Sequence, residues 1–97
     1  METMVEATTR LREAGYVLDL SPVAGGKLRC GERGEIVDAR YATVAETVRF
    51  EGASNPDDQA ILTALICPGG HMGLFSAAYG PTAAPQEEDV LLALTNR

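Results

Sequence analysis

The two cysteines and the single histidine of the chain lie in two short, glycine-rich segments. Cys30 opens the segment Cys30–Gly34 (CGERG), and Cys67 opens the segment Cys67–Gly73 (CPGGHMG), with His71 four residues later. Glycine reaches the positive φ angles of tight turns at little cost, so both segments are predicted to be turns. Thiolates and imidazoles bind zinc, and a thiolate beside an imidazole can act as a nucleophile. Metal binding and nucleophilic catalysis are therefore the chemistries to weigh.

Two tight turns, each with a thiol at its entrance and strands expected on both sides, resemble the knuckles of small zinc-ribbon proteins. A ribbon usually carries Cys-x-x-Cys-Gly twice and so supplies four tetrahedral zinc ligands. Here Arg33 stands at the second ligand position of the first turn. A guanidinium cannot bind a metal ion, because it is always protonated. The layout is also similar to that of small actinobacterial proteins, a similarity that implies no particular activity.

The resemblance allows two interpretations of this partial ligand set. In the first, Cys30, Cys67 and His71 hold zinc and leave the fourth position open, as catalytic zinc sites do. Three nearby acids are then candidates for that position or for a general base: Glu32, Glu35 and Asp38. In the second, the metal has been lost, Arg33 supplies the positive charge, and the cysteines are small buried residues. The second interpretation is favoured, because structural zinc sites almost always have four protein ligands.

Other reactions are less well supported by the residues present. Cys67 and His71 are close enough in sequence for a thiolate–imidazolium pair, but no local signature of a cysteine-enzyme family surrounds them. The segment Cys67–Gly73 lacks the Gly-Lys-Ser/Thr ending of a phosphate-binding loop. A single histidine leaves no Ser-His-Asp arrangement to test.

Composition indicates one globular domain spanning residues 1–97, with 45% hydrophobic and 23% charged residues. The net charge of -6 opposes binding to nucleic acid, whose phosphates need a basic face. The longest apolar run, Ala60–Cys67, is too short for a membrane span, and the N-terminus has no secretory signal. We therefore expect a soluble, cytoplasmic protein. Of its eight basic residues seven are Arg, which indicates a high-GC, bacterial genome.

Helices are expected at both ends of the chain. Thr3 and Glu6 have the spacing of a capping box at the start of a helix over Thr3–Gly15, and Gly15 suits its left-handed C-cap. A short C-terminal helix is expected to begin at Pro85, with acidic residues at the positive end of its dipole, and to fray from Thr95 onward.

The middle of the chain reads as strands separated by turns. Val44–Phe50 alternates most regularly, with Val44, Val48 and Phe50 on one face and Glu46 as the exception among them. Ala60–Cys67 fits either a strand or a helix, and a strand is favoured. The other expected strands are 16–20, 27–30, 35–39 and 74–79, with turns at 21–26 and 52–58.

These elements predict an α+β fold in which an N-terminal helix and a short C-terminal helix pack on an antiparallel sheet of four to six strands. The two zinc-ribbon-like turns are expected at the same end of the sheet, with Cys30 and Cys67 as neighbours. The leading functional hypothesis is a small, non-enzymatic binding or adaptor protein on a degenerate zinc-ribbon-like scaffold, whose acidic surface takes a protein partner. The alternative is a zinc-binding protein that uses Cys30, Cys67 and His71, with a catalytic or regulatory open position.

Overall fold

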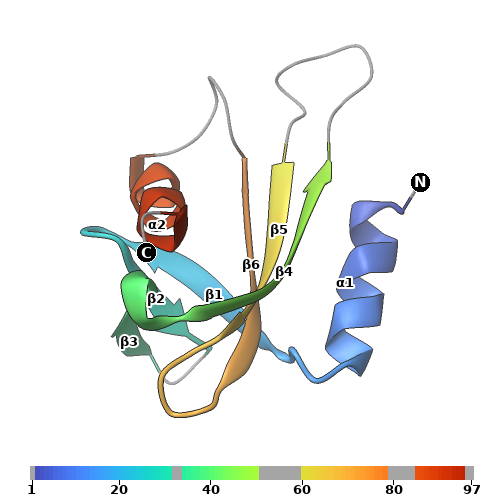
Figure 1. Ribbon diagram of the computed structural model, residues 1–97, viewed down its shortest axis with the longest axis horizontal. Coiled ribbons are helices and arrows are strands. Elements are labelled where there is room, and N and C mark those ends of the chain that lie inside the picture. The colour runs from blue at the N-terminus through green and yellow to red at the C-terminus, as the bar shows by residue number, and fades with distance from the viewer. Residues whose placement is uncertain (1, 32–33, 51–59, 79–84, 96–97) are drawn as a thin grey trace.

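The computed structural model describes residues 2–31, 34–50, 60–78 and 85–95. Glu32, Arg33 and the predicted turn at 52–58 lie outside these ranges. The elements, in chain order, are α1 (Met4–Glu13), β1 (Leu18–Val23), β2 (Lys27–Cys30), β3 (Glu35–Asp38), the 3-10 helix η1 (Ala39–Tyr41), β4 (Thr43–Phe50), β5 (Ala60–Ile66), β6 (Met72–Ala78) and α2 (Pro85–Thr95) (Figure 1). The predicted α+β class is therefore confirmed. None of the described helices is long and apolar enough to cross a membrane.

The six strands form one mixed sheet in the order β3-β2-β1-β6-β5-β4. Strands β1, β2 and β3 form one antiparallel meander, and β4, β5 and β6 form another. The two meanders meet where β1 pairs with β6 in parallel, through Leu18↔Gly73 and Asp19↔Leu74. We call this junction the seam. The prediction of a purely antiparallel sheet was wrong, because the two meanders join through strands that run in the same direction.

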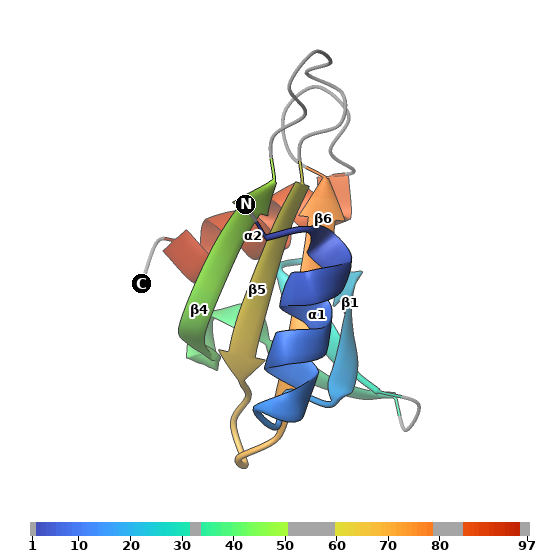
Figure 2. The ribbon, with the colours of Figure 1, turned by 90° about the vertical axis from the view of Figure 1, so that its right-hand side faces the viewer.

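The helices cover opposite faces of the sheet, so the fold has three layers (Figures 1 and 2). Helix α1 contacts β5 and β6, where Ala7 and Leu11 share a buried cluster with Leu62 and Leu74. Helix α2 contacts β1, β2 and η1 on the other face. The larger core lies there, around the fully buried Phe75. Each helix therefore covers strands of the meander that is distant from it in sequence.

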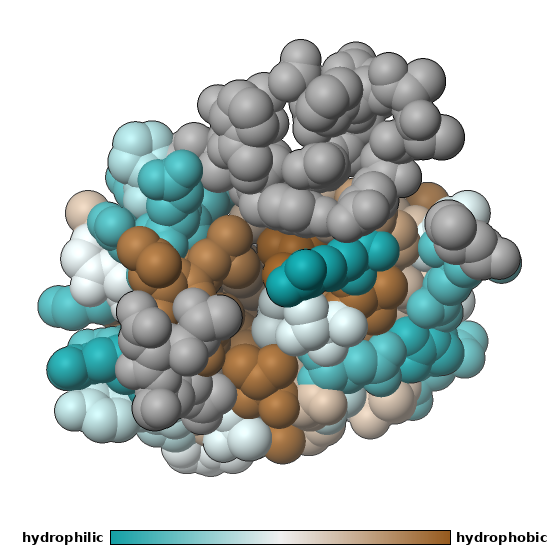
Figure 3. Space-filling view, turned by 45° about the horizontal axis from the view of Figure 1, so that its top comes forward, coloured by the Kyte–Doolittle hydropathy of each residue, from teal (hydrophilic) through white to brown (hydrophobic). Residues whose placement is uncertain are grey.

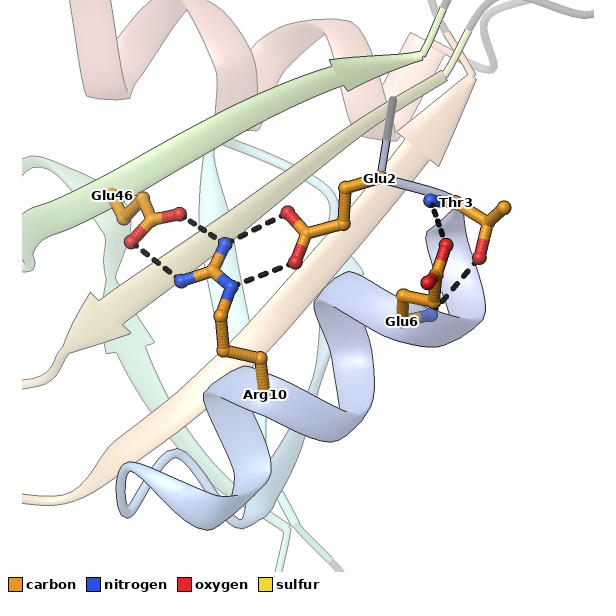
Figure 4. Close-up of polar contacts among 5 residues, drawn as sticks. All are labelled: Glu2, Thr3, Glu6, Arg10 and Glu46. Atoms are coloured by element: carbon orange, nitrogen blue, oxygen red, sulfur yellow. Dashed lines mark hydrogen bonds and ion pairs between the residues drawn. The ribbon is translucent and has the colours of Figure 1, made fainter.

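The local signals at the ends of α1 are formed as predicted. The Thr3 hydroxyl accepts a hydrogen bond from the Glu6 N–H, and the Glu6 carboxylate accepts one from the Thr3 N–H, which completes the capping box (Figure 4). At the other end Gly15 has φ of 112°. The N–H groups of Tyr16 and Gly15 donate to the carbonyls of Leu11 and Arg12, as in a Schellman motif. This motif turns the chain from α1 into β1.

Strand β1 begins and ends later in the chain than the sequence predicted. It runs from Leu18 to Val23, so the predicted strand at 16–20 and turn at 21–26 were both displaced. Pro22 is tolerated inside the strand because β1 pairs with β6 only at Leu18 and Asp19. Beyond Asp19, β2 is the only strand that pairs with β1 among the described residues, so β1 behaves like an edge strand at Pro22.

A β-bulge in β4 divides its apolar residues between the two faces of the sheet. Val44 pairs with Leu65 and Glu46 with Ala64, so Ala45 is the extra residue. Val44 consequently packs on the core under α2, whereas Phe50 packs on the cluster under α1. The prediction that Val44 and Phe50 share a face was wrong, because a bulge shifts the side-chain alternation by one residue.

The bulge also places Glu46 on the face covered by α1, where it meets Arg10. The Arg10 guanidinium binds Glu46 through Nη1 and Nη2, at 3.1 and 2.5 Å, and binds Glu2 through Nε and Nη2, at 2.7 and 3.0 Å (Figure 4). These hydrogen bonds lower the pKa of Glu2 and of Glu46. The carboxylate that interrupts the apolar pattern of β4 is thus an anchor for α1.

Strand β5 has buried residues on both faces, which explains why its sequence lacks alternation. Leu62 and Ala64 belong to the cluster under α1, and Leu65 belongs to the core under α2. The interpretation of this segment as a strand is confirmed. The C-terminal helix is also confirmed, and Val90 and Leu94 bury its inner face. In the space-filling view hydrophobic residues, in brown, gather between hydrophilic residues, in teal (Figure 3).

Candidate functional site

Cys30 and Cys67 are in contact in the interior, as the sequence predicted. Their Sγ atoms are 3.7 Å apart, within hydrogen-bond reach of two thiols, and both residues are buried free cysteines. Cys30 ends β2 and Cys67 directly follows β5. Because β2 and β5 run in the same direction in the sheet, their last residues lie at the same end. The sheet topology therefore places both cysteines at one end of the sheet, and their side chains meet within the core cluster under α2.

The second turn holds Cys67 rigidly. The Cys67 N–H donates to the His71 carbonyl at 2.7 Å, and its own carbonyl accepts from the Gly70 N–H at 3.0 Å. Gly69 and Gly70 have φ angles of 95° and 90°, which other residues rarely adopt. The segment after β5 is thus a tight hairpin turn that reverses the chain into β6.

The first turn is anchored to β1. The Gly31 N–H donates to the Asp19 carbonyl at 3.0 Å. Gly31 and Gly34 both have positive φ, at 63° and 73°. Arg33, which the sequence placed at the second ligand position, lies between them and outside the described residues.

The spacing of the two sulfurs suits a metal ion as well as a thiol pair. Two thiolates bonded at about 2.3 Å to a tetrahedral zinc are about 3.8 Å apart. Within the described ranges, however, no three His, Cys, Asp or Glu side chains converge to hold a metal ion. His71 Nε2 instead lies 3.9 Å from Glu35 Oε2, and both side chains are more than half exposed. The structure therefore pairs the two cysteines with each other and pairs His71 with Glu35.

The other acids proposed for the fourth ligand position are placed differently. Asp38 lies at the far end of β3 from Glu35, where its side chain accepts a hydrogen bond from the Arg40 N–H that caps η1. This hydrogen bond lowers the pKa of Asp38. Asp38 thus has a structural role at η1, whereas Glu35 lies beside His71.

Burial determines the protonation of Cys67. Desolvation, followed by the contact with Cys30, raises the pKa of the Cys67 thiol from 9.0 to about 12. A thiol nucleophile works as the thiolate, and catalytic cysteines have lowered pKa values. A thiol held protonated in this way is a poor nucleophile at neutral pH, which argues against the Cys67–His71 catalytic pair.

A hollow of about 640 Å³ opens at this end of the sheet. The starts of β1 and β3, the end of β2 and the second turn all contribute to its wall. Its lining combines apolar, acidic and thiol groups from Val17, Leu18, Asp19, Ser21, Cys30, Gly31, Glu35 and His71. We call it the end hollow. Cys30 lies in its wall, whereas Cys67 is not among the residues that line it.

Sequence reasoning missed the contribution of β1 to the end hollow. Val17, Asp19 and Ser21 carry no motif, and the sequence predicts only an ordinary strand and turn there. Their role depends on the seam, which places β1 between the two cysteine-bearing segments. The signal for this contribution is the 64% exposure of Val17, which only the structure provides.

Comparison of the chain with protein-family models, with curated proteins and with solved structures gave no match.

Proposed function

We propose that the chain is a small, non-enzymatic binding or adaptor protein on a degenerate zinc-ribbon-like scaffold, and that its partner is a protein segment with basic side chains. The observation that carries this proposal is the end hollow, which sets two acids beside exposed apolar surface. Glu35 supplies the negative charge open to a partner, since Asp19 is already paired with Arg12, and Val17 supplies the apolar contact. The net charge of -6 favours a basic partner over an acidic one.

The edge of the sheet beside the hollow suggests how such a segment would bind. Strand β3 is an edge strand of the sheet, and within the described residues it pairs only with β2. An extended peptide can add to such an edge through main-chain hydrogen bonds, with side-chain pockets supplying specificity. A segment on β3 would pass Glu35, whose carboxylate lies 3.9 Å from His71 Nε2. A Lys or Arg of the partner would enter the hollow there.

The test uses a nine-residue peptide that alternates Val with Thr and carries Lys at its centre, with a Glu-centred peptide as its control. We expect the Lys peptide to shift the amide resonances of β3, His71 and Val17, and the Glu peptide to leave them unchanged. Glu35→Lys should weaken binding at least tenfold, whereas Glu88→Lys, the same charge change on exposed α2, should not. Equal binding by the two variants, or shifts confined to other surfaces, would refute the proposal.

A second candidate function, zinc binding through Cys30, Cys67 and His71, is favoured by the 3.7 Å separation of the two sulfurs. In this case His71 would have to leave Glu35 to complete a three-ligand set. Protein purified without a polyhistidine tag should then contain zinc at a ratio near one, and Cys67→Ser should lose it. A ratio near zero, together with a melting temperature that chelator does not change, would exclude this candidate.

A further inference from the structure

We propose that Cys30 and Cys67 are a reversible oxidation site, at which a small disulfide compound converts the two thiols into an intramolecular disulfide that fastens the two meanders together. The proposal is independent of what binds in the end hollow.

Proximity and fixed backbones carry the first step of the argument. The two sulfurs are already 3.7 Å apart, and a disulfide bond of about 2.0 Å requires them to approach by about 1.7 Å. Cys30 is held by pairing with Leu20 and Glu35, and Cys67 by its hydrogen bond to the His71 carbonyl. The sulfurs therefore meet without competition from alternative positions of the main chain.

Access through the end hollow carries the second step. Cys30 lies in the wall of a cavity of about 640 Å³, so a small disulfide can reach it from solvent. Cys30 is 6% exposed, whereas Cys67 is 2% exposed and is not among the residues that line the hollow. This asymmetry makes Cys30 the sulfur that reacts first and Cys67 the sulfur that resolves the intermediate.

The reaction is a double thiol–disulfide exchange. The Cys30 thiolate attacks one sulfur of the small disulfide RSSR, forms a mixed disulfide with it and releases RS⁻. The Cys67 thiol is mostly protonated, but its attack is intramolecular: it gives its proton to the released RS⁻, attacks Cys30 Sγ and displaces the second RS⁻. The two protons given up by the cysteines end on the two released thiols. The protein is thus oxidised by two electrons, and RSSR is reduced to two RSH.

The position of the bond in the fold gives it a structural effect. Cys30 belongs to the β1–β2–β3 meander and Cys67 to the β4–β5–β6 meander. Among the described residues, the strands of the two meanders pair with each other only at the two residue pairs of the seam. A disulfide would add a covalent link between the two meanders close to this short junction. It would also close a long loop of chain, which in the chain-entropy model gives a large stabilisation. We expect oxidation to raise the melting temperature by about 10 °C or more.

The experiment treats the reduced protein with graded ratios of oxidised to reduced glutathione, with and without EDTA, and then counts free thiols by alkylation and mass spectrometry. We expect the wild type to lose both thiols and about 2 Da in mass, with no glutathione retained. Cys67→Ser should retain one glutathione on Cys30, and Cys30→Ser should stay unmodified at Cys67. The thiol count and mass of the wild type test the proposal even if neither variant folds.

Three results would overturn the proposal. The first is a wild type that keeps both thiols at the most oxidising ratio, both with and without EDTA. The second is oxidation that yields only glutathione adducts or cross-linked dimers. The third is an oxidised monomer that melts no higher than the reduced one. Thiols that resist oxidation without EDTA but are oxidised in its presence would support the proposal, because the two sulfurs then form a disulfide once a metal ion is withdrawn.

Discussion

Replacing Gly73 with Ala should separate the two meanders of the sheet. Gly73 lies in the seam, opposite Leu18 of β1. A Cβ at this position would lie 2.8 Å from the Leu18 carbonyl oxygen, 2.9 Å from Leu20 Cγ and 3.0 Å from Leu18 Cβ. Its φ is not positive, so the substitution adds steric conflict without backbone strain. The effect therefore measures how closely β1 and β6 approach.

The expected magnitude follows from these contacts. Restoring an ordinary separation of 3.4 Å to the Leu18 oxygen requires a shift of about 0.6 Å. The atoms to be moved belong to the main chain and to Leu20, which is buried in the core and cannot rotate freely. Overpacking of this kind costs about 1 to 3 kcal/mol, so we expect a loss near 2 kcal/mol and a fall of about 10 °C in melting temperature.

Urea unfolding followed by far-UV circular dichroism measures this loss, and amide hydrogen exchange at Gly73 and Leu18 locates it. Ser76→Ala, on the exposed surface of the same strand, is the matched control and should remain within about 0.5 kcal/mol of the wild type. If Gly73→Ala were as stable as Ser76→Ala, β1 would not lie against Gly73 and the parallel seam would be wrong.

Three further changes test other parts of the fold. Thr3→Ala should lower the free energy of unfolding by about 1 kcal/mol, measured by urea unfolding, because it removes the acceptor of the capping box. In Arg10→Gln the free energy of unfolding should fall less between pH 6 and pH 3 than in the wild type. Because the pKa values of Glu2 and Glu46 are lowered in the folded state, the two carboxylates stabilise the wild type at pH values above their unfolded-state pKa. Protonation at lower pH removes that contribution. An unchanged acid limb in this variant would contradict the ion pairs. The wild type should lose stability between pH 9 and pH 12, because the Cys67 thiol, whose pKa is raised to about 12, keeps its proton in the folded state after the unfolded chain has lost it. Cys67→Ser should not show this loss. Identical alkaline limbs of the two unfolding curves would show that Cys67 is not desolvated.

Signals that act within a few residues were readable from the sequence. The capping box at Thr3, the left-handed Gly15 and the bounds of β2 all follow from neighbouring residues. The proximity of Cys30 and Cys67 also followed, because each cysteine precedes a glycine-rich turn expected at the same end of the sheet.

What could not be read depends on contacts between distant segments. The parallel seam consists of two residue pairs between β1 and β6, and no periodicity in either strand predicts it. No sequence pattern predicts the bulge at Ala45 either, and the bulge places Val44 and Phe50 on opposite faces of the sheet. Glu46 looked like an exception only because its partner, Arg10, is on a helix 36 residues away.

The exchange of helices between the two meanders has a consequence for how the chain folds. Helix α1 precedes β1 but covers β5 and β6, and α2 follows β6 but covers β1, β2 and η1. Neither meander can bury its apolar face with the helix next to it in sequence. A fragment ending after η1 would expose the face that α2 covers, and a fragment starting at β4 would expose the face that α1 covers. The two ends of the chain must therefore reach opposite halves of the sheet before either half is stable. Such long-range contacts raise the contact order, so we expect folding to be cooperative and slower than that of a fold with local contacts.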